Sequence, residues 1–373
     1  PLIITAAEGE KPIVDGSVTI PRGDQRWEDT GNGLWSLRLP QANDYVGYVA
    51  QNGLRMYWYK SLENIKRGEI LLRNNNIPSK VGRGWFYDRQ SGKLFIRTGN
   101  ENPPRDHSYN VAVRPYGALL SGAEHLVVKG IEFRFFGESG VCLDKGTQAC
   151  IVRNNLVHNA QRGIIFQDSL TRDNAIWHNE VYEQGLVDYT WSQIKASEYG
   201  RQGIQGVAGR GNSICHNLIH GYFDGIAPAV WGNPGQLHLN RDMDIMYNRI
   251  YNIGDDAIEV EGCAQNVRIH GNIMRNCFVA ISLAPIEHGP TYATRNDATY
   301  SFLMFKLNVG VPSEGYSYCY HNSGYCLTRG EVYGGTGISF ASAGMIPIDH
   351  KHFANNVIVC DNYAIRNAND HHW

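Results

Sequence analysis

The most constraining feature of this 373-residue chain is a short motif, apolar-x-x-Asn, that returns at nearly regular intervals. Its asparagines are Asn155, Asn179, Asn217, Asn248, Asn272, Asn296, Asn322 and Asn356. Successive members are separated by 24, 38, 31, 24, 24, 26 and 34 residues, which indicates a repeat of about two dozen residues with occasional insertions. Such a repeat predicts a solenoid of stacked coils.

The segments between the asparagines predict the kind of coil, because runs such as 257–261 and 280–283 alternate with a period of two. Parallel strands on neighbouring coils lie about 4.8 Å apart, so an Asn at one turn of every coil can hydrogen-bond along the stack while its backbone takes the left-handed bend. We therefore expect an all-β fold, a right-handed parallel β-helix. The expected inward row is Ile164, Ile204, Ile226, Ile258, Ile281 and Phe305; the outward row is Ile165, Gln205, Ala227, Glu259, Ser282 and Lys306.

Composition agrees with a β-rich chain with many turns, since there are 41 glycines and only 19% charged residues. The formal net charge of −2 does not favour a nucleic-acid partner, and no run of about twenty apolar residues predicts a membrane span. The eight cysteines have neither zinc-site nor disulfide-framework spacing, although Cys319 with Cys326, or Cys142 with Cys150, are candidate pairs.

Three parts are expected along the chain. Residues 1–21 read as opening coils of the solenoid, and residues 113–373 as the main β-helix with a catalytic groove. Residues 22–112 break the period and contain alternating runs around turns, notably 84–88 followed by 92–96. This pattern predicts a small antiparallel β-module inserted near the N-terminus.

The longest insertions, at 183–201 and 231–242, flank strands of the same sheet on adjacent coils. They carry Tyr189, Trp191, Trp231 and His238. Aromatic rings stack on the apolar faces of sugars, so these residues are candidates for substrate binding in a groove along the solenoid. The alternative is that they only pack the loops onto the coils.

Acidic residues gather beside these loops. Aligning 222–226 with 254–258 stacks Asp224 on Asp256, with Asp255 adjacent. Crowded carboxylates raise at least one pKa, as a general acid requires, and Glu259 and Glu261 are expected to point into the same groove. Two alternatives remain open: aspartates are common turn caps, and clustered carboxylate oxygens also suit Ca²⁺. We expect no required cofactor and assign no metal ligand, with calcium as the ion such a cluster would take.

The first part of the chain contains, in order, the motifs GxW, LP, NGxR, GxWFYD and GKLFIR, and coils with the asparagine ladder follow them. This order resembles the front module of bacterial right-handed β-helix carbohydrate-active enzymes. The acidic pattern is similar to that of inverting polygalacturonases and their β-helical relatives. This resemblance implies that Asp255 is the general acid, that Asp224 and Asp256 activate the attacking water, and that Lys306 binds substrate. Three positions depart from the family's pattern: Met304 stands where the family has arginine, Val279 where it has histidine, and residues 222–224 read Tyr-Phe-Asp instead of Asn-Thr-Asp. These departures argue against pectin as the substrate.

Three further residues are weaker candidates for substrate binding. Gln205 lies on the expected outward row, while His288 and Arg295 follow the acidic cluster closely enough to reach a groove. His178 and His216 precede ladder asparagines and are expected to be structural.

The favoured function is a glycoside hydrolase that degrades a poly- or oligosaccharide by an inverting mechanism, acting as a monomer or weak homo-oligomer. Its location would be secreted, periplasmic or cell-surface; the chain starts at Pro1 within a strand pattern, which is typical of a mature exported form. The alternatives are a polysaccharide lyase acting by β-elimination with help from Ca²⁺, and a non-catalytic glycan-binding β-helix. If Glu259 and Glu261 were the reacting pair, their closer spacing would favour retention instead.

Overall fold

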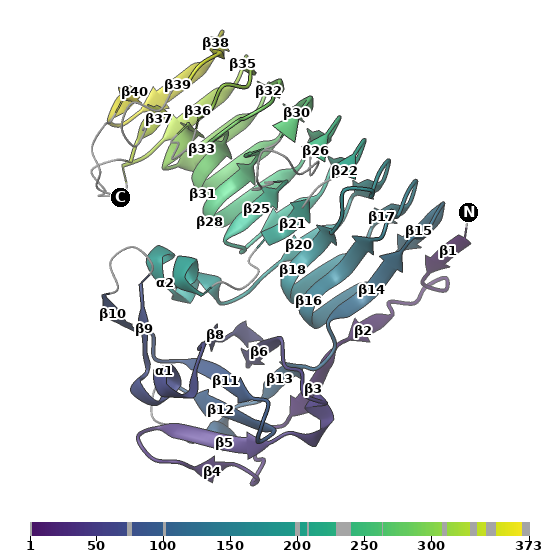
Figure 1. The fold of residues 1–373 in the computed structure, drawn as a ribbon, viewed down its shortest axis with the longest axis vertical. Helices are drawn as coiled ribbons and strands as arrows, with labels where there is room; N and C mark the ends of the chain where they lie inside the picture. Colours follow the sequence, from purple (N-terminus) through teal and green to yellow (C-terminus); the bar gives the residue numbers. More distant parts are fainter. Residues whose placement is uncertain are drawn as a thin grey trace.

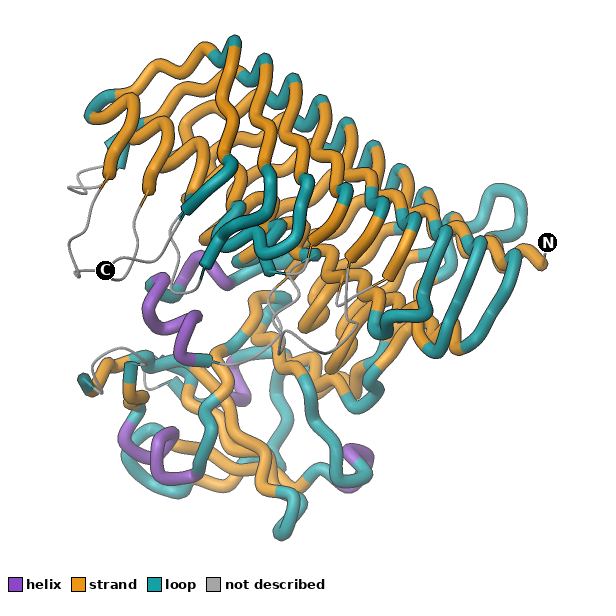
Figure 2. The backbone as a smooth tube through the Cα atoms, turned by 45° about the horizontal axis from the view of Figure 1, so that its top comes forward, coloured by secondary structure: helices purple, strands orange, loops and turns teal. Residues whose placement is uncertain are grey.

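The computed structural model describes residues 2–72, 77–99, 102–197, 202–206, 209–228, 240–262, 264–307, 312–328, 334–340 and 348–367. The chain forms a parallel β-solenoid with a separate β-module beside its first coils (Figure 1). Figure 2 shows the coils stacked one upon another, with the module below them. No helix in these ranges is long and apolar enough to cross a membrane.

The first face of the solenoid is a sheet of parallel strands, one from each coil. In spatial order they are β1 (Leu2–Thr5), β15 (Leu126–Lys129), β17 (Ile151–Arg153), β19 (Ala175–Trp177), β23 (Ser213–Cys215), β27 (Asp244–Met246), β30 (Val267–His270), β32 (Thr291–Thr294), β35 (Ser317–Tyr320) and β38 (Lys351–Ala354).

The second and third faces belong to one bent sheet, because four long strands run through the corner between them. These are β16 (Glu132–Asp144), β18 (Leu156–Phe166), β28 (Arg249–Glu259) and β31 (Ile273–Ser282). The second face joins their first halves to β2 (Ile13–Asp15), β20 (Glu180–Tyr182), β24 (Leu218–His220), β33 (Asp297–Ser301), β36 (Ser323–Cys326) and β39 (Val357–Cys360).

The third face joins the second halves of the long strands to β14 (Tyr116–Ser121), β21 (Gln202–Gly206), β25 (Asp224–Ala227), β34 (Leu303–Lys306), β37 (Thr336–Phe340) and β40 (Tyr363–Asn367). A short sheet of β22 (Gly209–Arg210), β26 (Asn240–Arg241) and β29 (Ala264–Gln265) lies between the third and first faces. The row predicted to point inward on the third face is fully buried: Ile164, Ile204, Ile226, Ile258, Ile281 and Phe305 are each 0% exposed.

The predicted asparagine ladder is present. The side-chain amide of each ladder asparagine donates to Oδ1 of the next, at 2.9–3.1 Å. The prediction that the ladder residue itself takes the left-handed bend is wrong. The positive φ belongs to the residue before it, for example 54° at His178 and 58° at His216. The bend lies there because the ladder asparagine uses its own N–H to bond to the next asparagine.

Residues that precede the ladder asparagines also stack along the turn. The imidazole rings of His178 and His216 lie 4.9 Å apart and nearly parallel, and Tyr247 continues the stack at 5.2 Å from His216. These two histidines therefore have a structural position in the turn, as predicted.

The β-module consists of small sheets around its own buried cluster, which includes Leu37, Trp85 and Tyr109. One sheet contains β3 (Ser17–Ile20), β13 (Tyr109–Ala112), β6 (Tyr48–Gln51) and β7 (Leu54–Arg55). Another contains β4 (Glu28–Asp29), β5 (Leu34–Arg38), β12 (Lys93–Arg97), β11 (Gly84–Asp88) and β8 (Tyr57–Trp58). The remaining elements are β9 (Glu69–Leu71), β10 (Pro78–Lys80), α1 (Leu62–Arg67), η1 (Pro40–Ala42) and η2 (Pro104–Asp106).

Pairing in the module is antiparallel as expected, except that β8 and β11 are parallel. Strands β1 and β2 pair with β15 and β16, so they belong to the solenoid's first coil. Strand β3 already pairs with β13, so the structural boundary of the module lies at about residue 17 rather than after residue 21. The strand pattern before the boundary continues into β3, which is why the sequence did not separate them.

The insertion at 183–197 connects the module to the solenoid and contains η3 (Leu186–Asp188) and α2 (Trp191–Ala196). Figure 2 shows the helix between the two parts. At its base, Glu183 accepts hydrogen bonds from Tyr48 at 2.8 Å and from Arg55 at 3.2 Å, all three being buried. Near its end, the Tyr57 hydroxyl donates to the Gln193 carbonyl at 2.9 Å. The module therefore fixes the position of α2.

All described cysteines are free, so the predicted pairs Cys319–Cys326 and Cys142–Cys150 are wrong. Parallel stacking explains the error, since neighbours in space are one coil apart in sequence rather than a few residues apart. Cys326 instead faces Cys360 on the next coil.

Candidate active site

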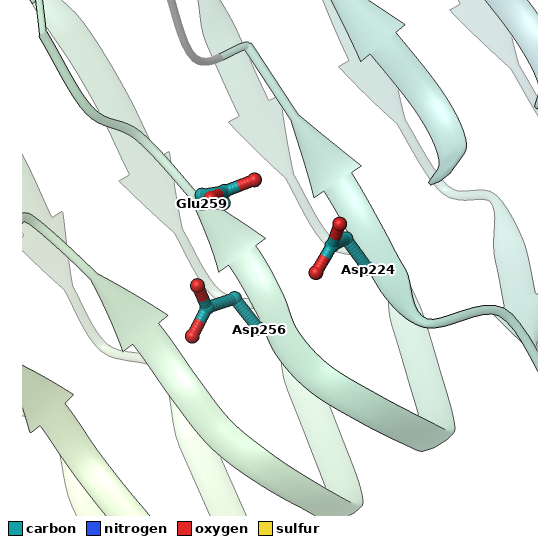
Figure 3. A group of neighbouring side chains, drawn as sticks. All are labelled: Asp224, Asp256 and Glu259. Carbon is teal, nitrogen blue, oxygen red and sulfur yellow. The ribbon is translucent and has the colours of Figure 1, made fainter. Parts of the chain in front are cut away.

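Three carboxyl groups meet on the outside of the third face. Asp224 lies at the start of β25, and Asp256 and Glu259 lie on the neighbouring strand β28 (Figure 3). One oxygen from each lies within 4.8 Å of the other two. The pairing of Ile226 with Ile258 gives the register that stacks Asp224 on Asp256, as the sequence alignment predicted.

Asp255 does not belong to this group of three. A bulge in β28 lies between Ile253 and Asp256. The Asp255 carboxylate lies 2.7 Å from the ammonium group of Lys195, on α2, and is hydrogen-bonded by the Trp191 side chain. The compact cluster predicted from residues 224, 255 and 256 is therefore completed by Glu259, while Asp255 faces the helix.

Lys306 is the second cation of the site. It extends from β34, and its Nζ lies 2.5 Å from Asp256 Oδ2 and 3.5 Å from Glu261 Oε1. Glu261 also accepts a hydrogen bond from the Ser282 hydroxyl, on the strand between them. Glu261 lies just after β28 and is 3% exposed, so it supports Lys306 from the side of the cluster.

Burial and charge set the protonation of the cluster. Burial, together with Asp224, Glu261 and Asp256, raises the pKa of Glu259 well above its usual value. Burial and the neighbouring acids also raise the pKa of Asp256, but here Lys306 is the strongest opposing influence. At Glu259, Lys306 also opposes the rise in the pKa, but its effect is smaller than those of burial and of the three acids. The pKa of both carboxyl groups is therefore raised well above the usual value, and Lys306 opposes the rise most directly at Asp256, which it contacts.

Asp255 has the opposite shift. Burial alone would raise its pKa, but the charges of Lys306 and Lys195 outweigh burial and lower it. A general acid must hold its proton near neutral pH, so the role that the resemblance implies for Asp255 does not fit this environment. The causes are the charge of Lys306 and, after it, the charge and hydrogen bond of Lys195 on α2.

Asp256 has a further feature that matters for chemistry. One of its oxygens binds Lys306, while the other, Oδ1, is buried and has no hydrogen-bond partner among the described residues. Asp224 is held differently, since its Oδ2 accepts a hydrogen bond from Gln202 at 3.1 Å. Solvent reaches the cluster along Glu259, Lys195 and Lys306, which are partly exposed.

Aromatic rings lie beside the cluster. Trp191 is 37% exposed at the start of α2, and its ring centre lies 6.3 Å from Phe223 and 6.4 Å from Phe278. The Lys195 ammonium lies over both Trp191 and Phe223, at 5.3 and 5.2 Å from the ring centres. Trp191 is thus next to the acids, where a substrate-binding aromatic was expected.

Tyr189 has a different position from the one predicted. It is buried against Tyr57, and its hydroxyl accepts a hydrogen bond from the Tyr57 backbone at 2.9 Å. It therefore packs the insertion onto the module, which is the alternative that the sequence left open. Trp231 and His238 lie outside the described residues.

The weaker candidates are dispersed. Gln205 lies on the same outward row as Glu259, with Ala227 between them. Arg295 is in the ladder turn between the first and second faces, one residue before Asn296, and so is away from the cluster. His288 is exposed in the turn before β32, and no hydrogen bond or ion pair among the described residues joins it to the acids.

Sequence reasoning missed Lys195, Gln202 and Phe278. A signal for the first was present, because Thr190 and Gln193 form a capping box that starts α2 and so predicts a helix with Lys195 in its last turn. Gln202 had a weaker signal in its register with Asp224. Phe278 had none, since the bend of β31 decides that its ring reaches Trp191.

Comparison with known proteins agrees with this architecture. Residues 116–296 match the family model described as the right handed beta helix region. This part of the chain is a right-handed parallel β-helix. The predicted fold is therefore confirmed, and no curated protein matches the sequence.

Two solved structures align with nearly the whole chain. A structure of XylC in complex with xylose has a TM-score of 0.60 and 15% identity, covering 95% of this chain and 76% of that one. A structure named glycoside hydrolase has a TM-score of 0.55 and 9% identity, covering 98% of this chain and 84% of that one. An alginate lyase from Paenibacillus sp. strain FPU-7 matches with a TM-score of 0.42 and 12% identity, covering 68% and 80% of the two chains. At these identities, the likeness to the first two structures shows the fold alone.

Proposed function

We propose that this protein is a glycoside hydrolase whose reacting groups are Asp256 and Glu259. The observation that carries the proposal is the close approach of their carboxyl oxygens, within 4.8 Å, beside Lys306. The fold adds support by analogy, since one structure that shares it binds xylose and another is named a glycoside hydrolase.

The environments of the two carboxyl groups suit different roles. Glu259 has the raised pKa of a proton donor and is the most exposed acid of the group. Asp256 has one oxygen held by Lys306, and within the described part of the chain its other oxygen has no hydrogen-bond partner, which suits a carboxylate that attacks carbon.

The spacing favours retention over the predicted inversion. Inverting enzymes separate their carboxyl groups by about 6.5–9.5 Å to admit a water, whereas retaining enzymes hold them about 5–5.5 Å apart. One oxygen of Asp256 lies within 4.8 Å of one oxygen of Glu259, a closest approach that suits the shorter separation better than the longer one.

The reaction then proceeds in two displacements. Asp256 forms a bond to the anomeric carbon as the glycosidic C–O bond breaks, and Glu259 gives its proton to the departing oxygen. In the second step Glu259 takes a proton from water, whose oxygen bonds to the anomeric carbon as the ester to Asp256 breaks. Lys306 stabilises the Asp256 carboxylate in both steps, because it remains 2.5 Å from Oδ2.

A lyase is less well supported by the same residues. A β-elimination needs an unprotonated base, and Lys306 is the basic residue inside the cluster. Burial alone would lower its pKa, but Asp256, Glu261, Asp255 and Glu259 raise it well above the usual value. Lys306 therefore keeps its proton, and Arg295 and His288 lie apart from the acids.

The test is hydrolysis of a panel of aryl glycosides and neutral and acidic oligosaccharides, with the product configuration followed by proton NMR. We expect new reducing ends with retained anomeric configuration and no ultraviolet absorbance from a double bond. Glu259→Gln should lose about 10²–10⁴-fold in kcat. Added azide should restore the activity of Glu259→Gln and give a glycosyl azide of retained anomeric configuration. With Asp256→Gly, azide should give the glycosyl azide of inverted configuration. An unsaturated product, or unchanged rates in both variants, would exclude the proposal.

A further inference from the structure

A hollow of about 890 Å³ lies where the second face meets the corner that leads to the acid cluster. Its walls come mainly from β28 and β31, and its lining includes Arg249, Tyr251, Arg275 and Tyr300. This volume is in the range of ligand sites, which is about 300–1,000 Å³.

Two arginines give the hollow its charge. Arg249 and Arg275 are exposed on neighbouring strands, and neither forms an ion pair within the part of the chain that the structure describes. No carboxylate is among the residues that line the hollow. Two acids lie on the flanking strands: Glu180 is two strands from Arg249, and Asp297 is on β33, next to the strand that carries Arg275. Neither is among the described residues that line the hollow. The hollow is therefore a positive site on a chain whose net charge is −2.

The other groups suit a sugar. The Arg275 guanidinium is already placed 5.1 Å over the ring of Tyr300, which orients its planar fork. Tyr251 adds a second ring with a hydroxyl, and the amides of Asn252 and Asn276 form the edge toward the corner, joined by a 2.6 Å hydrogen bond. Guanidinium binds a carboxylate through two parallel hydrogen bonds, while amides and ring faces contact hydroxyls and apolar sugar faces.

The position of the hollow relative to the acid cluster indicates that the anion it binds is part of the glycan. The same two strands carry both sites: β28 runs from Arg249 and Tyr251 through the corner to Asp256 and Glu259. At about 3.3 Å per residue, Tyr251 and Asp256 are at most about 17 Å apart along the strand. Asp255 lies on the strand between them and contacts Lys195 of α2, so a glycan that joins the two sites would pass beside this helix.

We propose that this hollow binds a uronic acid unit of the glycan, a few sugars from the bond that the acid cluster cleaves. The inference rests on the proposed function and names its substrate class: a polysaccharide that carries carboxylates. Arg249 and Arg275 bind the carboxylate, and the pair of tyrosines and asparagines binds the ring.

The experiment uses two readouts on the full chain. Binding is measured by calorimetry with oligosaccharides containing glucuronate, galacturonate or mannuronate, each compared with its carboxyl-reduced neutral counterpart. Activity is measured on an aryl glycoside, which occupies the acid cluster but is too short to reach the hollow. The variants are Arg249→Gln with Arg275→Gln, and the control is Arg153→Gln, an exposed arginine on the first face.

We expect one acidic oligosaccharide to bind at least about tenfold more tightly than its reduced form. The double variant should lose that difference and keep its aryl glycoside rate, while Arg153→Gln should change neither. Equal binding of the acidic and reduced forms, or an unchanged double variant, would overturn the inference. Equally strong competition by inorganic phosphate would also overturn it, because it would show an adventitious ion only. Absence of all hydrolysis with the binding difference intact would reject the proposed function and leave the uronate site standing.

Discussion

Lys306 Nζ lies 2.5 Å from Asp256 Oδ2, although the two residues belong to strands separated by β31. The lysine therefore crosses a whole coil to neutralise a carboxylate that is 0% exposed. This contact opposes the rise in the pKa of Asp256 that burial and the neighbouring acids cause.

Lys306→Met should move the acidic limb of the kcat/KM profile to higher pH. Without the ammonium group the pKa of Asp256 rises further, because burial and the neighbouring acids are then unopposed. Asp256 must be ionised to attack, so a higher pH is needed. The variant should also lose about 3–5 kcal/mol of stability, as expected when one partner of a buried pair is removed. Lys11→Met, at an exposed position, is the control; a profile that loses height without shifting would contradict the role of Lys306.

Hydrolysis should not depend on a divalent cation. The oxygens of Asp224, Asp256 and Glu259 are close enough to hold one, but an ion there would compete with the Lys306 ammonium for Asp256. Excess chelator should therefore leave the rate on an aryl glycoside unchanged, and added Ca²⁺ should not increase it. A loss of activity that Ca²⁺ restores would instead make the carboxylates metal ligands.

Glu259→Gln should stabilise the protein more at pH 8 than at pH 4. Burial, Asp224, Glu261 and Asp256 raise the pKa of Glu259 above 4.5, so the folded state holds a proton that the unfolded chain has lost. The contribution of Glu259 to stability is therefore complete below its pKa in the unfolded chain, and it declines as the pH rises through its pKa in the folded state. Glutamine does not ionise, so the gain in stability of the variant over the wild type should be larger at pH 8 than at pH 4. Thermal unfolding at both pH values measures this, with exposed Glu314→Gln as the control.

The solenoid could be predicted because its information is local and repeated. Each ladder asparagine, such as Asn248, occurs with the same apolar neighbours, and only a parallel stack satisfies all of them. The register of Asp224 on Asp256 followed from the same repeat. The environment of Asp255 did not, because it depends on Lys306 two strands away and on Lys195, on an insertion whose position depends on the module. Contacts such as Arg55 with Glu183, 128 residues apart, have no periodic signal in sequence.

Asn248→Ala should destabilise the solenoid strongly. Asn248 is 0% exposed and accepts hydrogen bonds from the backbone and side chain of Asn217, while its amide donates to Asn272 and to a backbone carbonyl. Alanine leaves buried groups on both neighbouring coils without partners, at about 1–3 kcal/mol each. Denaturant unfolding should show a loss of several kcal/mol, against little change for Asn367→Ala at the exposed end of β40. A loss no larger than the control would mean that the ladder is incidental to stability.

Oxidation should join Cys326 to Cys360 rather than either pair predicted from sequence. The two cysteines face each other on β36 and β39, and adjacent parallel strands place Cα atoms about 4.8 Å apart, within the range that a disulfide spans. The hydrogen bond from Cys326 lowers the pKa of Cys360, which favours the thiolate that starts the reaction. The bridge would close a loop of 34 residues (360 minus 326) and should stabilise the last coils by roughly 3–4 kcal/mol. Peptide mapping after mild oxidation identifies the bridge, and unfolding with and without reductant measures its effect. Cys215→Ser should leave both results unchanged, whereas Cys360→Ser should abolish them; a bridge found between other cysteines would show that the facing register does not control oxidation.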